Sequence, residues 1–267
     1  MKYKLIISDY DGTLGCAPSN DIPKQTLDAI NKYTEKGGIF VVCSGREYSS
    51  IRTICIEQGL KGLLACFQGA MITNLETEEV LFSGGMSEED AMTALSAAEE
   101  SGLQPIVYTP NGFYIEKDTE YTAKYEKAVR VKGLIANAKD TVRKFHKVCK
   151  LGWLGDPKVV SEFAKKLNQE YLEKGIQFNI GVPFLMEAIN PKHSKGNAVR
   201  FLAEYYNIPL SSVMAVGDST NDIDLISGEW HGVAVGDGRE ELKAVAKEIT
   251  VPFKDMPIKH LIEKYCL

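Results

Sequence analysis

Short apolar runs and amphipathic segments alternate along the first part of the chain. Pro23 suits the first turn of a helix, and the pair Gly37 and Gly38 supplies a stop for it. The pattern predicts strands at 4–7 and 39–43 and helices at 23–36 and 47–58. Further short strands are expected at 63–67, 71–73 and 80–82. This β-α-β-α order is typical of a parallel sheet with crossover helices.

The pattern changes after Ser87. An acidic helix comes first, and two strands then flank the turn formed by Pro110, Asn111 and Gly112, which suits a hairpin. The elements expected in this stretch are strands at 104–109, 112–116, 148–154 and 176–180 and a helix at 157–173. They predict a separate α+β unit that ends near Pro183.

Strand and helix alternate again in the last third of the chain. The elements expected there are strands at 184–189, 213–216, 232–235 and 249–251 and helices at 195–206 and 239–247, followed by a final helix. We therefore predict a discontinuous α/β core made of residues 1–83 and 184–267, with an α+β domain inserted at 84–183.

Composition and charge restrict the partners. With 267 residues, 44% of them hydrophobic, the chain can bury a full core. Its net charge of −5 and the absence of long Lys or Arg blocks argue against nucleic acid and membrane surfaces as partners. No signal-like or membrane-length apolar segment occurs, so a cytoplasmic location is expected. The expected oligomeric state is a monomer or a homodimer. The six cysteines and four histidines lack metal-ligand spacing, which argues against zinc.

Two acidic clusters carry the most information about chemistry. Asp9 and Asp11 follow the first apolar run, and Asp218 and Asp222 follow the run at 213–216. Both clusters are thus predicted at the carboxyl ends of parallel strands, where ligand sites of open α/β sheets gather. Neighbouring carboxylates can hold a hard cation, or divide into an ionised group and a proton donor. Each cluster alone could also be a turn or a helix cap.

Two further segments fit a phosphate site. Ser44 and Gly45 lie between an apolar strand and a helix, where a hydroxyl and backbone amides can bind an anion, although Ser44 could also be a simple N-cap. Lys195 stands at the predicted start of a helix, with Lys192 as a nearby alternative. A lysine at that position opposes the helix dipole unless an anion or carboxylates offset its charge.

Taken together, these segments resemble the four motifs of the haloacid dehalogenase (HAD) superfamily, whose members are mostly phosphatases. The first motif is Asp9-Tyr10-Asp11-Gly12-Thr13-Leu14, and the others are Cys43-Ser44-Gly45-Arg46, the Lys195 segment and Gly217-Asp218-Ser219-Thr220-Asn221-Asp222. The order and the insertion point resemble the Cof-type branch; phosphomannomutase and sucrose phosphatase have similar caps. The resemblance implies a Rossmann-like core with an inserted cap domain that closes over the site and chooses the substrate.

The resemblance also implies roles for individual residues. Asp9 would be the nucleophile that forms an aspartyl-phosphate, and Asp11 would be the general acid and base. Mg²⁺ would be held by Asp9, Asp218 and the Asp11 backbone carbonyl. Phosphate would be bound by Gly12, Ser44, Gly45 and Lys195, with support from Thr13, Asn221 and Asp222. The implied substrate is a small phosphomonoester such as a sugar phosphate.

Three alternatives stay open on the sequence. A sugar phosphomutase would use the same aspartyl-phosphate, a phospho-accepting signalling domain would share the paired acids and the lysine, and an inert binding module would lack the chemistry. The inserted domain argues against a signalling module, which is about half this length. The chain also departs from the family pattern at Gln68, where asparagine is common, and at Asp237, within a segment that often reads Asn-Ala.

Overall fold

A computed structural model describes residues 1–15, 19 and 21–267 of the chain. The chain forms two compact units. Unit 1 comprises residues 1–44, 52–81 and 194–267, and unit 2 comprises residues 45–51 and 82–193. None of the helices in the described part of the chain is both long and apolar enough to cross a membrane.

Unit 1 is built on an eight-stranded sheet with the order β16-β15-β14-β1-β2-β3-β4-β5. The pairs from β16 to β3 are parallel, and β4 joins β3 in antiparallel register. The strands are β1 (Leu5–Ser8), β2 (Ile39–Cys43), β3 (Leu63–Cys66), β4 (Met71–Asn74), β5 (Val80–Ser83), β14 (Val213–Gly217), β15 (His231–Ala234) and β16 (Glu248–Ile249). The strands β1, β2, β3 and β14 are apolar or small-residue runs that are almost entirely buried, as expected for a sheet covered on both faces.

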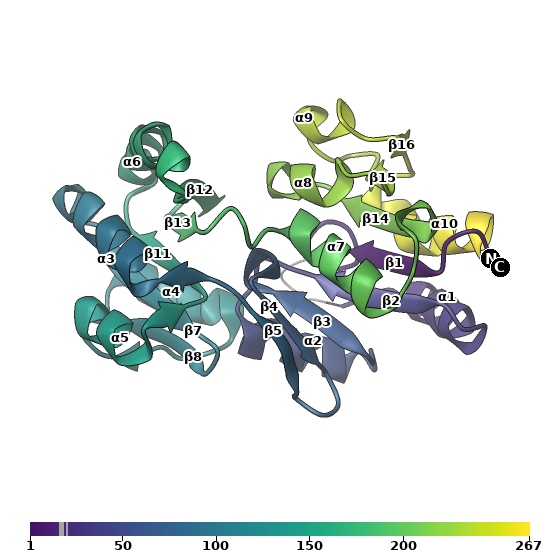
Figure 1. Cartoon of the computed structure of the whole chain (residues 1–267), viewed down its shortest axis with the longest axis horizontal. Helices are drawn as coiled ribbons and strands as arrows, with labels where there is room; N and C mark the ends of the chain where they lie inside the picture. The colour runs from purple at the N-terminus through teal and green to yellow at the C-terminus, as the bar shows by residue number, and fades with distance from the viewer. Residues whose placement is uncertain (16–18, 20) are drawn as a thin grey trace. The chain divides into compact units, whose positions relative to one another are not determined.

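The helices of unit 1 follow from this strand order. The chain passes from β1 to β2 on one side of β1 and from β14 to β15 on the other, so right-handed crossovers place α1 and α8 on opposite faces. Figure 1 shows the termini beside each other, and the Lys2 N–H donates to the Tyr265 carbonyl across 2.9 Å. The helices are α1 (Lys24–Glu35), α7 (Lys195–Tyr205), α8 (Ile223–Ile226), α9 (Glu240–Lys243) and α10 (Pro257–Tyr265). Helix α2 (Tyr48–Glu57) begins in the part of the chain assigned to unit 2 and continues in unit 1 from Arg52.

The strand order also determines where the polar motifs meet. β14, β1 and β2 are neighbours in the sheet and run parallel, with Ser8 opposite both Val216 and Val42. Asp218, Asp9 and Ser44 follow the ends of these strands. Three motifs that are distant in sequence therefore emerge at one edge of the unit 1 sheet.

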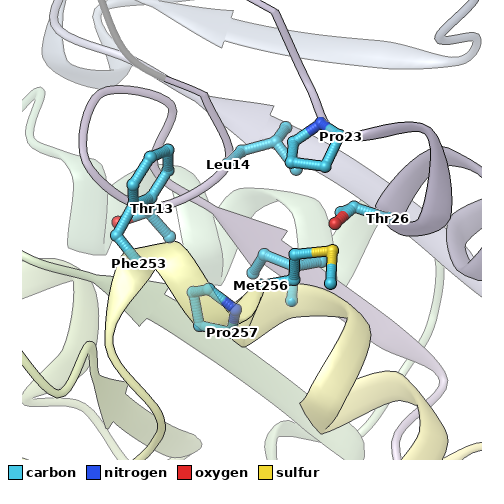
Figure 2. Close-up of a pocket in the computed structure, with 8 residues that line it drawn as sticks. Thr13, Leu14, Pro23, Thr26, Phe253, Met256 and Pro257 are labelled. Carbon is cyan, nitrogen blue, oxygen red and sulfur yellow. The ribbon is translucent and has the colours of Figure 1, made fainter.

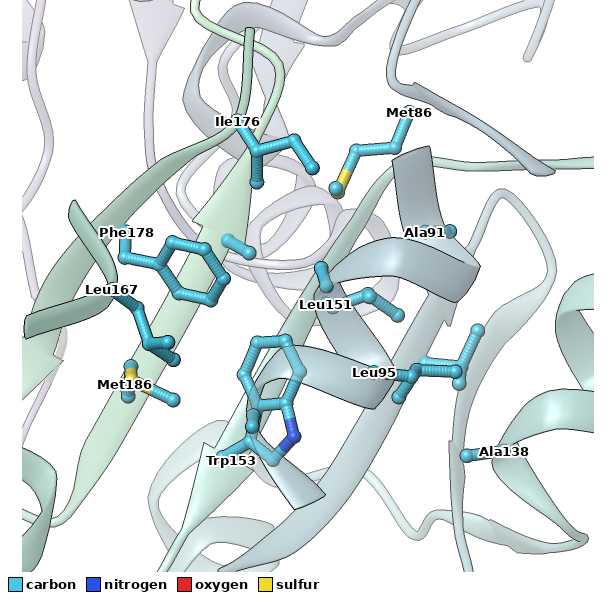
Figure 3. Packing of buried hydrophobic residues seen from close by; sticks show 14 of the residues in the cluster. Met86, Ala91, Leu95, Ala138, Leu151, Trp153, Leu167, Ile176, Phe178 and Met186 are labelled. Carbon is cyan, nitrogen blue, oxygen red and sulfur yellow. The ribbon is translucent and has the colours of Figure 1, made fainter. Parts of the chain in front are cut away.

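Unit 2 contains a six-stranded sheet with the order β12-β13-β11-β7-β8-β9, which is antiparallel except for the β8–β9 pair. Its core includes Trp153, Phe178 and Met186, which are at most 2% exposed. Figure 3 shows these side chains in the packed cluster. The strands of this sheet are β7 (Gln104–Thr109), β8 (Gly112–Ile115), β9 (Leu134–Ile135), β11 (Lys150–Leu154), β12 (Gln177–Val182) and β13 (Leu185–Ile189). Two further strands, β6 (Met86–Ser87) and β10 (Lys147–Val148), pair antiparallel in a separate two-stranded sheet. The helices are α3 (Glu88–Ala97), α4 (Glu120–Val129), α5 (Ala138–Phe145) and α6 (Pro157–Tyr171).

One strand lies in a different sheet from the one predicted. We expected the run at 184–189 to resume the parallel core, but β13 pairs antiparallel with β11 and β12 in the six-stranded sheet. All five residues of β13 are buried, so its apolar pattern fits either sheet equally well. The sheet that a strand joins depends on which strands pair with it, and a local sequence pattern does not show these partners. The division into domains at residues 84 and 183 stays a prediction.

A buried ion pair lies inside unit 2. Lys150 and Glu187, which are 2% and 5% exposed, form a direct salt bridge between β11 and β13. The Lys150 Nζ also donates to the Gly45 carbonyl across 3.0 Å and lies 4.7 Å from the centre of the Tyr108 ring. This lysine therefore ties the segment after β2 to the sheet of unit 2.

Replacing Glu187 with alanine is expected to destabilise the protein by about 3–5 kcal/mol, because it leaves the Lys150 charge buried without its partner. The double variant Lys150→Met/Glu187→Leu should recover most of that loss, since it removes both charges. Glu170→Ala is the matched control: Glu170 pairs with Lys174 on the surface of α6, and its loss should cost less than about 1 kcal/mol. Urea unfolding of the four proteins measures these differences, and equal losses for Glu187→Ala and Glu170→Ala would contradict the expectation.

Among the described residues, a small, mainly apolar pocket of unit 1 contains a side-chain hydroxyl without a hydrogen-bond partner. Leu14, Pro23, Thr26 and Met256 line it and are drawn around it in Figure 2. Thr26 is 2% exposed, and no group in the described part of the chain forms a hydrogen bond with its hydroxyl. A buried hydroxyl without a partner destabilises the folded state.

The isosteric change Thr26→Val should therefore stabilise the protein by about 1 kcal/mol, because it replaces the unpaired hydroxyl with a methyl group. Thr26→Ser is the control. It keeps the hydroxyl and loses the methyl, so it should lower stability. Thermal unfolding of the two variants and the wild type distinguishes the outcomes, and a valine variant that is less stable than the wild type would be the opposite result.

Candidate active site

A buried lysine joins the two acidic clusters. Lys195 is the first residue of α7 and only 1% exposed. Its Nζ lies 2.6 Å from Asp9 Oδ1 and 2.6 Å from Asp222 Oδ1. The first and fourth sequence motifs thus meet at one ammonium group, while Lys192 is exposed.

The local sequence explains how a lysine can begin a helix there. The Ser194 hydroxyl caps α7 by accepting from the Asn197 N–H across 3.4 Å. The Asp224 carboxylate accepts from the Gly196 N–H across 2.9 Å, and a Cβ at Gly196 would lie 2.5 Å from the Asp224 carbonyl oxygen. Glycine therefore lets the two segments approach closely. The carboxylates of Asp9, Asp222 and Asp224 offset the unfavourable position of the lysine at the positive end of the helix dipole.

Both oxygens of the Asp222 carboxylate accept hydrogen bonds. One oxygen, Oδ1, faces Lys195, and the other, Oδ2, accepts from the backbone N–H groups of Asp218 and Ser219, each across 3.1 Å. The side chain is fully buried. Asp222 therefore fixes both the lysine and the turn that carries Asp218.

Asp218 is positioned from the first motif. The Thr13 hydroxyl donates to Asp218 Oδ1 across 3.2 Å. Gly12 has a φ of +82°, and a Cβ at this position would collide with the Asp218 carboxylate. Glycine is thus required twice over, for the left-handed backbone and for the close approach of the two loops.

The carboxylates offer a site for a metal ion. Oxygens of Asp9, Asp218 and Asp222 lie within 4.8 Å of one another. Asp222 uses both oxygens in hydrogen bonds, whereas Asp9 Oδ2 accepts none from the described residues. Asp9 and Asp218 are therefore the available side-chain ligands, and their hard oxygens suit a cation such as Mg²⁺.

Negative charge dominates the cluster. Burial and the nearby Asp222 carboxylate raise the pKa of Asp9 well above its usual range, although Lys195 opposes this. Burial and Asp222 also raise the pKa of Asp218, to about 6. Burial lowers the pKa of Lys195, but Asp222 and Asp9 outweigh it and raise that pKa well above its ordinary value. One ammonium facing three carboxylates leaves excess negative charge that a bound cation would neutralise.

Comparison with known proteins identifies the family. The profile of a family described as haloacid dehalogenase-like hydrolases matches residues 6–262, nearly the whole chain. The chain belongs to this family. The predicted resemblance to the HAD superfamily is therefore confirmed.

Relatives of this hydrolase extend over its whole length. Phosphatase YwpJ of Bacillus subtilis is 25% identical over 283 residues, covering 97% of this chain and 99% of that protein. An HMP-PP phosphatase of Klebsiella pneumoniae is 24% identical, covering 93% of this chain and 89% of its own. The names of these relatives and the family match confirm the predicted enzyme class, a phosphatase.

Solved structures share the fold. A haloacid dehalogenase-like hydrolase from Bacteroides thetaiotaomicron superposes with a TM-score of 0.84 at 24% identity, covering 98% of this chain and 99% of that one. A structure described as a HAD subclass IIB sugar phosphatase gives a TM-score of 0.82 at 19% identity, with 98% of both chains covered. The predicted α/β fold, a Rossmann-like parallel core with an additional α+β part, is confirmed.

The hydrolase brings most of the predicted side chains of unit 1 together. Asp9, Thr13, Lys195, Asp218 and Asp222 form one connected network. The Thr13 hydroxyl donates to Asp218, which is not one of the predicted phosphate-binding residues.

Other predicted residues are placed differently. The Gly12 N–H, expected to hold phosphate, donates to the Gly15 carbonyl across 2.9 Å. Asn221 is exposed, and no hydrogen bond joins it to Lys195 within the described residues. Gly45 lies in unit 2. Their proposed roles therefore stay predictions.

The sequence reasoning missed two supporting acids. Asp224 binds the first turn of α7, and its position two residues after Asp222 was the available signal. Glu47 is fully buried in unit 2 and accepts from the Ser49 N–H across 2.9 Å and from the Ser50 N–H. It stands at the start of the predicted helix, where a carboxylate can accept from the first backbone N–H groups, and this position was the available signal.

The raised pKa of Asp218 predicts a pH dependence of stability. Its value rises from 3.8 to about 6 on folding, so the folded protein holds this proton more tightly than the unfolded chain. Stability without metal should therefore fall as the pH rises from about 4 to about 6. Asp218→Asn lacks the effect and should gain stability relative to the wild type over this window.

Urea unfolding in the presence of a chelator tests this sign. The difference between Asp218→Asn and the wild type should grow in favour of the variant from pH 4 to pH 6 and then level off. Growth in favour of the wild type would mean that Asp218 is stabilised as an anion in the absence of metal.

Proposed function

We propose that this hydrolase is a Mg²⁺-dependent phosphatase that cleaves small phosphomonoesters, with sugar phosphates as the favoured class, through an aspartyl-phosphate on Asp9. One observation carries the proposal. Asp9 is held by Lys195 through a single carboxylate oxygen, while its other oxygen accepts no hydrogen bond from the described residues. A carboxylate oriented in this way can attack with the unpartnered oxygen.

In the first step, Asp9 Oδ2 would form a bond to phosphorus as the bond from phosphorus to the substrate alcohol breaks. Asp11, which lies two residues later in a β-bridge with Gly15, would give its proton to the departing alkoxide. Water would then attack the phosphorus of the aspartyl-phosphate and give a proton to Asp11. The Asp9 carboxylate and inorganic phosphate result, which closes the cycle.

Cationic groups are required because the Asp9 carboxylate and the phosphoryl group are both negatively charged and repel each other. Two like unit charges 4 Å apart repel by about 4 kcal/mol at an effective dielectric of 20, which corresponds to roughly a thousandfold in rate. Lys195 places one positive charge against Asp9, and the Ser44 hydroxyl would bind a phosphoryl oxygen. Mg²⁺, held by Asp218, the Asp11 carbonyl and the Asp9 oxygen that does not attack, would supply further positive charge beside the phosphoryl group.

The specificity of the enzyme is assigned to the inserted part of the chain. We propose that the insert predicted at residues 84–183 forms the cap domain together with β13, and that the remaining parts of residues 1–83 and 184–267 form the catalytic core. The subclass IIB sugar phosphatase that shares the fold supports sugar phosphates as the first class to test.

Phosphate release from a panel of sugar phosphates, nucleotides and p-nitrophenyl phosphate tests the proposal, each with Mg²⁺ or with a chelator. Release from several phosphomonoesters with Mg²⁺, abolished by the chelator, is the expected result. Isomerisation of a sugar phosphate without phosphate release would favour the phosphomutase. Turnover that is unchanged by the chelator would remove the metal from the proposal.

A further inference from the structure

The turn between β3 and β4 has an unusual backbone. Its residues Phe67, Gln68 and Gly69 have consecutive positive φ values of 52°, 59° and 89°. A non-glycine residue in this left-handed region costs about 1–2 kcal/mol, and Phe67 and Gln68 both occupy it. Such strain persists only where the surroundings enforce it, and it is concentrated at functional sites.

One side of this turn holds Ser44. The Gln68 N–H donates to the Ser44 carbonyl across 3.1 Å, and the Ser44 N–H donates to the Ala65 carbonyl of β3 across 2.9 Å. Ser44 is fully buried. Both backbone groups of Ser44 are therefore anchored to β3 and to the turn that follows it.

The other side of the turn packs against the start of α7. A Cβ at Gly69 would lie 2.5 Å from the Ser194 carbonyl oxygen and 3.1 Å from the Ala198 Cβ. The same carbonyl accepts the Ala198 N–H across 3.0 Å, so it belongs to the first turn of the helix that begins with Lys195. Gly69 thus approaches α7 more closely than a residue with a Cβ atom could.

We propose that the Phe67–Gly69 turn is a positioning brace that sets the spacing between Ser44 and Lys195. The proposal rests on the function proposed above, in which the Ser44 hydroxyl binds a phosphoryl oxygen and Lys195 holds the attacking Asp9. The strained backbone lets Gln68 reach the Ser44 carbonyl while Gly69 contacts Ser194. Because phosphoryl binding by two fixed groups depends on their separation to within about 1 Å, a shift of the brace should weaken it.

The variant that displaces the brace is Gly69→Ala, and the chain supplies a matched control. Gly62 has a similar φ of +84° but no atom within 4 Å of an added Cβ, so Gly62→Ala introduces the same backbone strain in open space. Both variants should lose stability. Only Gly69→Ala should also raise the KM for p-nitrophenyl phosphate and the dissociation constant for inorganic phosphate, each by about tenfold or more.

Isothermal titration of the full-length protein with inorganic phosphate, in the presence of Mg²⁺, measures the effect independently of turnover. Equal phosphate affinities of Gly69→Ala and Gly62→Ala would overturn the brace and leave the proposed function intact. A wild-type protein that neither binds phosphate nor hydrolyses any phosphomonoester would instead overturn the proposed function, and with it the spacing role.

A second measurement needs no variant and covers the case in which Gly69→Ala does not fold. Hydrogen exchange of the wild-type protein should slow at the Gln68 and Ala198 amides when phosphate and Mg²⁺ are added, because both ends of the brace are then held. Unchanged exchange at these two amides under conditions of saturating phosphate would contradict the proposal.

Discussion

Replacing Asp9 with asparagine is expected to reduce phosphate release by at least roughly a thousandfold, because the amide cannot act as the nucleophile. The fold should survive. Asparagine has the same shape as aspartate and keeps an oxygen that can accept from Lys195. It also removes a carboxyl group whose pKa is raised because burial disfavours its charged form. The free energy of unfolding should therefore change by no more than about 1 kcal/mol.

The control for this variant is Asp28→Asn, the same chemical change at an exposed position of α1. It should retain the activity and stability of the wild type. Steady-state phosphate release and urea unfolding, measured for all three proteins, separate a chemical role of Asp9 from a structural one. Turnover of Asp9→Asn within about tenfold of the wild type would exclude Asp9 as the nucleophile.

Replacing Lys195 with methionine is expected to affect both activity and stability. Activity should fall by about 100- to 1,000-fold, the usual cost of losing one group that stabilises charge in the transition state. Stability should fall by about 3–5 kcal/mol, because the buried carboxylates of Asp9 and Asp222 lose their only ammonium partner among the described residues. The loss should be smaller at low pH, because Asp9, whose pKa is raised by burial, then takes up a proton and no longer needs a cationic partner.

Lys192→Met is the matched control for this change, since Lys192 is an exposed lysine three residues earlier in the same segment. It should lose neither activity nor stability to a comparable degree. Urea unfolding of both variants at pH 5 and pH 8 measures the charge effect. A stability loss for Lys195→Met that is larger at pH 5 than at pH 8 would show that the carboxylates do not depend on this lysine.

Local patterns predicted the part of the site that depends on strand ends. Asp9 and Asp218 follow apolar runs that form parallel strands. The carboxyl ends of parallel strands lie at one edge of the sheet, so the sequence alone predicts that these two residues lie close together. The prediction that Lys195 belongs to the site depended on the family resemblance. Periodicity alone favours a solvated lysine at a helix start, and it gives no sign that the side chain is 1% exposed.

Non-local pairing explains what was not predicted. The apolar run of β13 suits a parallel core strand, but its partners are β11 and β12. The Gly12 amide looked available for phosphate because its acceptor, the Gly15 carbonyl, depends on the conformation of the loop. The left-handed turn at Gln68 could not be recognised either, because that residue type gives no signal for a positive φ.

Detection of a phosphorylated Asp9 during turnover tests the central claim most directly. The wild-type protein would be mixed with p-nitrophenyl phosphate and Mg²⁺, quenched in acid within the first turnover, and analysed by peptide mass spectrometry. We predict one added phosphoryl group, stable in acid and released by hydroxylamine, on Asp9. Phosphate release without a phosphorylated protein, or with the group on another residue, would contradict the account.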